Sequence, residues 1–224
     1  VLIFYRKHMI NIVDNFINLK SKISLINNGN KTKIIAVSKT FTIEHIKPLI
    51  DYGHQDFGEN KVQEAEHKWN NLNERSNINL HMIGKLQSNK AKKAVQIFDY
   101  IHSLDNQKLA NTLSKYERDL NKKIKYFIQV NIGNEVQKSG INVSEIDKFY
   151  DYCQKDLNLN IVGLMAIPPI DNFKENLKTI SKLNTMLNLP ELSLGMSNDY
   201  IDAINNKATY VRIGSLIFGK RFNK

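Results

Sequence analysis

The sequence predicts an α/β protein built as a single (β/α)8 barrel with an extra N-terminal helix. Eight short apolar segments alternate with segments of helical periodicity, and this alternation implies parallel strands joined by right-handed crossovers. The length of 224 residues nearly suffices for such a barrel, which typically takes about 250 residues. An open doubly wound sheet is the rival fold. It usually begins with a Gly-rich turn, and the sequence contains no G-x-G-x-x-G or Walker A pattern, so the closed TIM barrel is preferred.

The first element that the sequence predicts is a helix over residues 9–26. Apolar residues recur there at near-helical spacing, and the Asn-Asn-Gly-Asn segment at 27–30 ends the pattern as helices commonly end. No linker rich in Pro, Gly or Ser divides the chain that follows. We therefore expect one barrel domain over residues 9–224, with residues 1–8 as an N-terminal extension.

Eight strands are then expected in order, because each segment is apolar or rich in β-branched and aromatic residues and is followed by a helical pattern. The predicted strands are 34–37, 55–58, 79–83, 100–104, 124–132, 161–167, 192–196 and 210–213. The helices or helix-like turns predicted after them are 42–50, 61–70, 88–98, 106–119, 144–155, 172–187, 199–205 and 216–219.

The composition is that of an ordinary soluble globular protein, with 42% hydrophobic and 24% charged residues. No apolar run approaches the roughly 20 residues of a membrane span, and the apolar start at residues 1–5 is too short for a signal-peptide core. The single cysteine, Cys153, excludes a disulfide framework and a cysteine-rich metal site. We therefore expect a cytoplasmic protein that does not contact a membrane.

The formal net charge of +10 fits three kinds of partner: nucleic acid, an anionic surface or a phosphorylated ligand. Lysine, asparagine and isoleucine are abundant throughout the chain, as in proteins from AT-rich genomes, and this compositional drift explains the charge equally well. The charge alone therefore selects no function.

Reactive groups of β/α barrels lie at the carboxyl ends of the strands, and the first strand ends at Ser38-Lys39. A desolvated amine loses its proton more easily and becomes nucleophilic, so Lys39 could hold a carbonyl compound covalently. The simpler interpretation is a lysine that faces water at a strand end. For an isolated lysine this second interpretation is the better one.

Two further groups follow the last two strands, where such barrels frequently bind phosphate. Gly195-Met196-Ser197 and Gly214-Ser215 offer backbone N–H groups and hydroxyl donors that suit an anion. Arg212 on the final strand is expected to point into the barrel mouth. It could pair with Glu59, or it could donate to the ring nitrogen of an aromatic heterocycle and keep that nitrogen unprotonated.

An amine, an anion site and an arginine together suit pyridoxal 5'-phosphate (PLP), which needs a Schiff-base lysine, a phosphate anchor and a partner for its ring nitrogen. A phosphorylated sugar could use the same anion site. The residues and their spacing leave both ligands open.

Seven motifs at the strand ends resolve this choice. They are AVSKT at 36–40, FGENKVQE at 57–64, HMIGKLQSNK at 81–90, IHSLD at 101–105, GLMAIP at 163–168, GMSND at 195–199 and VRIGSLIFGKR at 211–221. In this order they resemble the YggS/PROSC family of PLP homeostasis proteins, and the resemblance runs from about residue 10 to residue 221, nearly the whole chain.

The resemblance implies a barrel like the N-terminal domain of alanine racemase, with PLP as its cofactor. Lys39 matches the Schiff-base lysine and Arg212 the arginine at the pyridine nitrogen. The other positions that the resemblance assigns to the cofactor site are Asn60, His81, Met196, Ser197, Gly214 and Ser215, of which Ser197, Gly214 and Ser215 bind the phosphate. Leu80 and Leu194 depart from the usual family residues, but neither is a ligand.

We therefore predict a protein that holds PLP reversibly as a Schiff base and supplies apo PLP-dependent enzymes, rather than a dedicated catalyst. An unprotonated ring nitrogen is a poor electron sink, and racemases of this barrel type need a second domain for which the 224 residues leave no room. The alternative is a racemase-like enzyme of low or specialised activity. We expect a monomer rather than a dimer.

Two other classes of function are disfavoured. A nucleic-acid binder is suggested by the charge and by Lys85, Lys90, Lys92 and Lys93, but these residues fit a solvated helix face. A metal-dependent barrel is weaker still, because the six histidines include no H-E-x-x-H motif.

Overall fold

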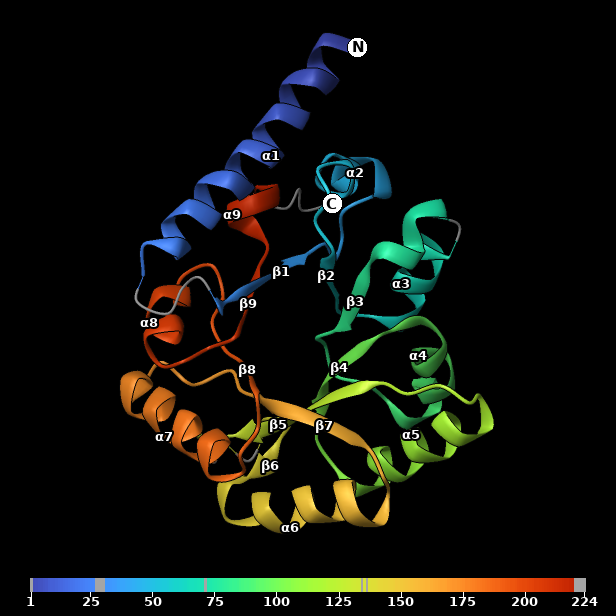
Figure 1. Cartoon of the computed structure of the whole chain (residues 1–224), viewed down its shortest axis with the longest axis vertical. Coiled ribbons are helices and arrows are strands. Elements are labelled where there is room, and N and C mark those ends of the chain that lie inside the picture. The colour runs from blue at the N-terminus through green and yellow to red at the C-terminus, as the bar shows by residue number, and fades with distance from the viewer. Residues whose placement is uncertain (1, 27–30, 71, 134, 136, 220–224) are drawn as a thin grey trace.

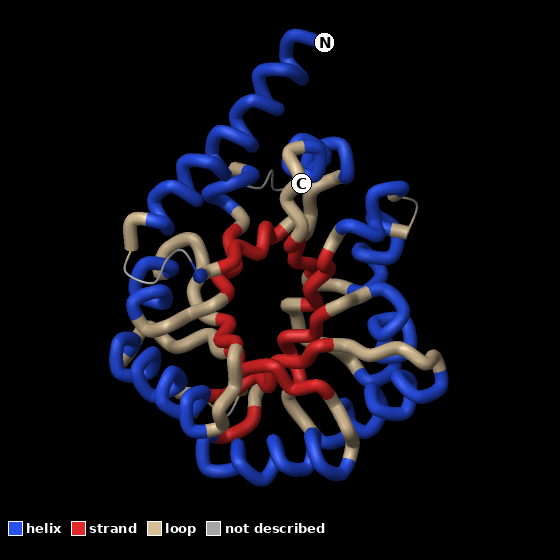
Figure 2. Tube along the Cα trace, in the orientation of Figure 1, coloured by secondary structure: helices blue, strands red, loops and turns tan. Residues whose placement is uncertain are grey.

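The computed structural model describes residues 2–26, 31–70, 72–133, 135 and 137–219. Eight parallel strands form a closed ring, and helices surround it on the outside (Figure 1, Figure 2). The strands of the ring are β1 (Lys33–Val37), β2 (Asp56–Glu59), β3 (Asn79–Met82), β4 (Tyr100–Leu104), β5 (Lys125–Asn131), β7 (Asn160–Met165), β8 (Glu191–Ser193) and β9 (Tyr210–Ile213). The ring is closed because β1 pairs with both β2 and β9, and β4 pairs with β5. The predicted (β/α)8 barrel is therefore confirmed.

The outer layer consists of helices that bury one face against the strands. Helix α5, for example, buries Leu109, Ala110 and Leu113, which share one side of a helix. The helices are α1 (Leu2–Ser24), α2 (Ile43–Asp51), α3 (Val62–Trp69), α4 (Ala91–Ile97), α5 (Gln107–Asp119), α6 (Ile146–Asp151), α7 (Phe173–Met186), α8 (Tyr200–Asn205) and α9 (Ser215–Phe218). Across the described ranges, no helix combines the length and apolar character needed to cross a membrane.

The differences from the predicted elements are small and have local causes. Helix α1 begins at Leu2 rather than at residue 9, because residues 2–8 contain no glycine or proline that would interrupt a helix. The segment predicted to end this helix, 27–30, lies outside the described residues. Several strands end earlier than predicted, because apolar residues continue past the hydrogen-bonded ladder into the loops. A two-residue strand, β6 (Ile141–Asn142), pairs with β5 and is too short to show any periodicity.

The barrel interior is partly polar. Ile35, Tyr100, Phe127, Met165 and Tyr210 form an inner apolar cluster, separate from the larger core between the strands and the helices. Alternation along the strands also turns polar side chains inward, and the fully or almost fully buried ones include His81, His102, Ser193 and Arg212. Each of these polar groups needs a hydrogen-bond partner inside the barrel.

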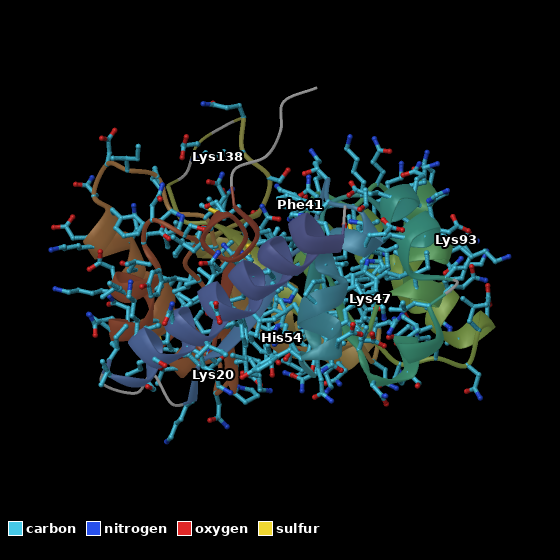
Figure 3. All side chains as sticks on the ribbon, turned by 90° about the horizontal axis from the view of Figure 1, so that it is seen from above. Lys20, Phe41, Lys47, His54, Lys93 and Lys138 are labelled. Atoms are coloured by element: carbon cyan, nitrogen blue, oxygen red, sulfur yellow. The ribbon has the colours of Figure 1, made fainter. Side chains whose placement is uncertain are left out.

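The two ends of the barrel are distinguished in Figure 3, where Phe41 and Lys138 lie toward one end and Lys20 and His54 toward the other. Phe41 follows β1 and Lys138 follows β5. The end with Phe41 and Lys138 is therefore the one where the strands terminate, and in β/α barrels this end carries the reactive groups.

Gly163 allows β7 and β8 to approach closely, since a Cβ atom there would lie 2.1 Å from the Glu191 carbonyl oxygen. We expect Gly163→Ala to lower the free energy of unfolding by about 1–3 kcal/mol, because the strands must move apart. Urea denaturation followed by circular dichroism measures the change. Gly53→Asn is the control, since no atom lies within 4 Å of an added Cβ at that turn. An equal loss in both variants would contradict the close-approach explanation.

Candidate functional site

A cavity of about 920 Å³ opens at the carboxyl ends of the strands. Seven of the eight residues predicted for the site line it, namely Lys39, Asn60, Met196, Ser197, Arg212, Gly214 and Ser215. They come from the loops after β1, β2 and β8 and from β9 with the turn that follows it. Residues far apart in the sequence therefore converge on one cavity.

An apolar wall that was not predicted from the sequence completes the cavity. Its members include Val37, Phe41, Ile83, Ile167, Ile170 and Phe173. For Ile83 and Ile167 the available signal was the continuation of apolar residues beyond the ends of β3 and β7, which the predicted strands 79–83 and 161–167 included as extra length. Such a wall suits the flat faces of an aromatic ligand.

Lys39 is half-buried and lies in the turn directly after β1. Ser38 before it is fully buried. Thr40 after it has φ +70°, in the left-handed region that β-branched residues rarely adopt. The backbone around Lys39 is thus held in an unusual conformation, and the side chain lines the cavity.

Two hydroxyl groups meet at another part of the cavity wall. Ser215 Oγ donates to Ser197 Oγ over 3.1 Å. The loop that carries Ser197 is shaped by Gly195, with φ +86°, and by the Met196 amide, which donates to Asp199 Oδ1 over 2.5 Å. The two hydroxyls and the backbone at Gly214 form the part of the cavity best suited to an anion.

Arg212 lies on β9 with its guanidinium almost fully buried, and it also lines the cavity. Nη1 donates to the Ser193 carbonyl and to Ser193 Oγ, both at 2.8 Å, and Nη2 donates to the Ala166 carbonyl at 3.1 Å. Burial lowers the pKa of Arg212 to about 10, so the group remains a cation at neutral pH. The alternative pairing with Glu59 is wrong, because the Arg212 guanidinium donates to Ser193 and Ala166, and Glu59 pairs with Lys68 at 2.8 Å instead.

His81, the eighth predicted residue, does not line the cavity. It is fully buried inside the barrel, stacked on Tyr100 with ring centroids 4.3 Å apart. Further along the chain, Ile83 occupies the cavity wall instead. The spacing of the motif indicates that His81 points inward but does not indicate how deep in the barrel it lies. Within the described part of the chain, no three His, Cys, Asp or Glu side chains gather as a metal site requires.

A continuous hydrogen-bond chain links Arg212 to His81 and beyond. His102 Nδ1 lies 3.0 Å from Ser193 Oγ, His102 Nε2 lies 3.0 Å from His81 Nδ1, and His81 Nε2 lies 3.1 Å from Asp56 Oδ1. Because a guanidinium can only donate, one consistent assignment has every group donating toward Asp56. Both imidazoles are then neutral, and Asp56 accepts at the far end.

The protonation states agree with this direction. Burial lowers the pKa of His81 and, more strongly, that of His102. Burial alone would raise the pKa of Asp56, but its interactions with His81, chiefly the hydrogen bond, outweigh burial and the pKa is lowered. At neutral pH the chain therefore contains two uncharged histidines between a cation and a carboxylate.

We expect the free energy of unfolding to decrease as the pH falls below about 6.5, the ordinary histidine pKa. The unfolded chain then binds protons that the buried His81 and His102 rings cannot bind, so stability present at higher pH is lost. Each histidine contributes at most about 1.4 kcal/mol per pH unit. Urea denaturation between pH 7 and pH 5 measures the slope.

His102→Gln should reduce that slope, whereas His67→Gln, a change at an exposed histidine, should leave it unchanged. Stability that is independent of pH in this range would overturn the assignment of neutral buried rings.

Comparisons with known proteins agree with the fold of the chain. Residues 11–221 match the family model described as the N-terminal domain of alanine racemase. A PLP homeostasis protein of Synechocystis sp. is 39% identical over 199 residues, which are 84% of this chain and 91% of that protein.

Solved structures extend the comparison. PipY of Synechococcus elongatus PCC7942, solved with PLP bound, is 31% identical with a TM-score of 0.83, covering 93% of this chain and 100% of that one. An alanine racemase of Clostridium difficile 630 is 15% identical with a TM-score of 0.73, covering 96% of this chain and 58% of that one, and shares the fold alone. The chain therefore belongs to the family of pyridoxal phosphate homeostasis proteins, on the fold of the alanine racemase N-terminal domain.

Proposed function

We propose that this protein holds PLP reversibly and serves the homeostasis and delivery of PLP in the cell. The observation that carries the proposal is the convergence of the Lys39 amine, the paired hydroxyls of Ser197 and Ser215, and Arg212 on one cavity. PipY, a relative covered over its full length, was solved with PLP bound.

The residues of the cavity fit PLP in size and chemistry. Its volume of about 920 Å³ lies within the range of about 300–1,000 Å³ usual for small-molecule sites. The three hydrogen bonds that Arg212 makes use three of the five N–H donors of a guanidinium. Donors therefore remain for a ring nitrogen, while Ser197 and Ser215 offer hydroxyls to a phosphate.

Each residue has a distinct role in this proposal. Lys39 Nζ would hold the aldehyde of PLP covalently, with loss of water. Ser197, Ser215 and the Gly214 backbone hold the phosphate, and Asn60 and Met196 shape the cavity. When bound, PLP supplies an aldehyde for reversible attachment and an electron-withdrawing ring.

We propose a carrier rather than an enzyme because of Arg212. Its pKa of about 10 keeps the guanidinium protonated at neutral pH, so it donates to the ring nitrogen without giving up its proton. A pyridine that stays unprotonated withdraws electrons weakly, which disfavours chemistry that builds negative charge on a substrate carbon.

A racemase-like enzyme is the second candidate, and the fold shared with an alanine racemase favours it. Polarimetric or chiral-chromatography assays with L-alanine distinguish the two. Steady conversion to the D-form at ordinary enzymatic rates would favour the enzyme.

The delivery role implies apo PLP-dependent enzymes as partners and a location in the cytoplasm, and we propose that the protein acts there as a monomer. Support for a reducing compartment comes from Cys153, which is a buried free thiol.

We expect Lys39→Ala to abolish the visible absorbance band of covalently held PLP. Among the described residues that line the cavity, Lys39 is the one lysine, and the variant lacks its amine. Borohydride treatment of the wild-type protein should fix PLP to the peptide that contains Lys39, as mass spectrometry can establish. Lys93→Ala, a change on the outer surface of α4, is the control. An unchanged band in Lys39→Ala would contradict the proposal.

Removing both hydroxyls at the anion site should weaken PLP binding at least about tenfold, since hydrogen bonds to charged groups contribute about 1.5–3 kcal/mol each. The variant is Ser197→Ala with Ser215→Ala, and fluorescence titration measures the dissociation constant. Pyridoxal, which lacks the phosphate, is the matched ligand and should bind the variant and the wild type alike. An equal loss for both ligands would place the phosphate elsewhere.

A further inference from the structure

Helix α3 contacts the peptide groups on both sides of Lys39. Lys68 Nζ donates to the Ser38 carbonyl over 2.8 Å, and the Thr40 amide donates to Glu64 Oε1 over 2.5 Å. Glu64 and Lys68 lie one turn apart on α3 and pair with each other at 3.1 Å. One ion pair thus bridges the peptide groups that precede and follow Lys39. We refer to Glu64 and Lys68 as the clamp.

The Lys68 ammonium is buried and fully hydrogen-bonded. Its side chain is only 7% exposed. Its acceptors are the Ser38 carbonyl, Glu59 Oε1 and Glu64 Oε1, which account for all three N–H donors of an ammonium group. A buried charge costs free energy unless it is paired and bonded in this way, so the geometry around Lys68 is tightly restricted.

Glu59 binds both Lys68 of the clamp and Ser38. Its carboxylate is fully buried, and Oε1 accepts from Ser38 Oγ at 2.7 Å, Lys68 Nζ at 2.8 Å and Trp69 Nε1 at 3.1 Å. The Ser38 amide also donates to the Gly58 carbonyl over 3.0 Å. The amide, hydroxyl and carbonyl of Ser38 are therefore all hydrogen-bonded. These bonds restrict the backbone conformation of the residue that precedes Lys39.

The backbone of Thr40, which follows Lys39, is stabilised by a different hydrogen bond. Thr40 has φ +70°, and a β-branched residue in the left-handed region is strained. The hydrogen bond from the Thr40 amide to Glu64 stabilises this conformation. Without that acceptor, the turn is free to relax toward ordinary backbone angles, and the direction of the Lys39 side chain changes with it.

We propose that Glu64 and Lys68 are positioning residues that aim the Lys39 amine into the cavity and thereby speed its reaction with the PLP aldehyde. Neither residue is among those that line the cavity, so both act through the backbone of Lys39. This inference rests on the proposed function, because it assumes that Lys39 is the point of attachment. A solely structural ion pair would stabilise the protein without affecting this reaction selectively.

The test compares two ligands that differ at the reacting group. Stopped-flow absorbance measures the rate of covalent attachment of PLP, and calorimetry measures the affinity for pyridoxamine 5'-phosphate, which has an amine in place of the aldehyde. Glu64→Ala and Lys68→Met should slow attachment by about tenfold to a hundredfold, as misplacement of a reacting group does. The affinity for pyridoxamine 5'-phosphate should stay nearly unchanged.

Glu66→Ala is the matched control, because Glu66 lies on the same helix and pairs with Lys93 at 2.6 Å, away from the clamp. If Lys68→Met does not fold, Glu64→Ala decides the question, since the Glu64 side chain is 27% exposed. Hydrogen exchange of the ligand-free protein should also become faster in the peptide 37–41 in Glu64→Ala but not in Glu66→Ala.

The proposed positioning role would be contradicted if PLP attached to Glu64→Ala at the wild-type rate. It would also be contradicted if the affinity for pyridoxamine 5'-phosphate fell by the same factor as the rate of PLP attachment. The separate Lys39→Ala experiment tests the point of attachment itself, so failure of the clamp and failure of the proposed function are distinguishable.

Discussion

The parallel pairing of β1 with β9 is the constraint on which the rest of the structure depends. It joins the first strand of the barrel to the last, with Ile35 opposite Arg212 and Ala36 opposite Ile213. Because both strands run in the same direction, the turns that follow them meet at one end of the barrel. Lys39 and Ser215 line the same cavity for this reason, although most of the chain lies between them.

Closure also creates an interior that the chain must fill, and this protein fills part of it with polar groups. A buried arginine and two buried histidines are costly unless each finds a partner. The hydrogen-bond chain from Arg212 through Ser193 and the histidines to Asp56 meets that requirement. The barrel can therefore present a cation to the cavity while Ser193, His102, His81 and Asp56 each have a hydrogen-bond partner.

The sequence was sufficient for the fold and for seven of the residues that line the cavity, because both depend on local patterns, but it did not indicate the apolar wall. Strand and helix periodicity predicts the order of elements, and the ends of parallel strands must meet at one face. The family resemblance assigned His81 to the cofactor site, but depth along the barrel axis is not a local property, and the structure places the His81 ring beside Tyr100 and His102 rather than in the cavity wall. In the sequence, nothing distinguishes Lys68 from an exposed lysine on a helix. Its burial depends on a loop carbonyl and two carboxylates that only the folded structure brings together.

The last strand has a further consequence for the biosynthesis of the protein. β1 leaves the ribosome before the other strands of the barrel, but its partner β9 and the turn with Gly214 and Ser215 are made after the other seven strands. Outside the ring, Asn15 of α1 donates to the Ile217 carbonyl of α9 over 3.2 Å, so the first and last helices also join only then. One edge of β1 stays unpaired until that moment, and contacts between distant segments form slowly. The cavity is therefore assembled only after all eight strands of the barrel have been made, and a ligand that needs both Lys39 and Ser215 binds after that point.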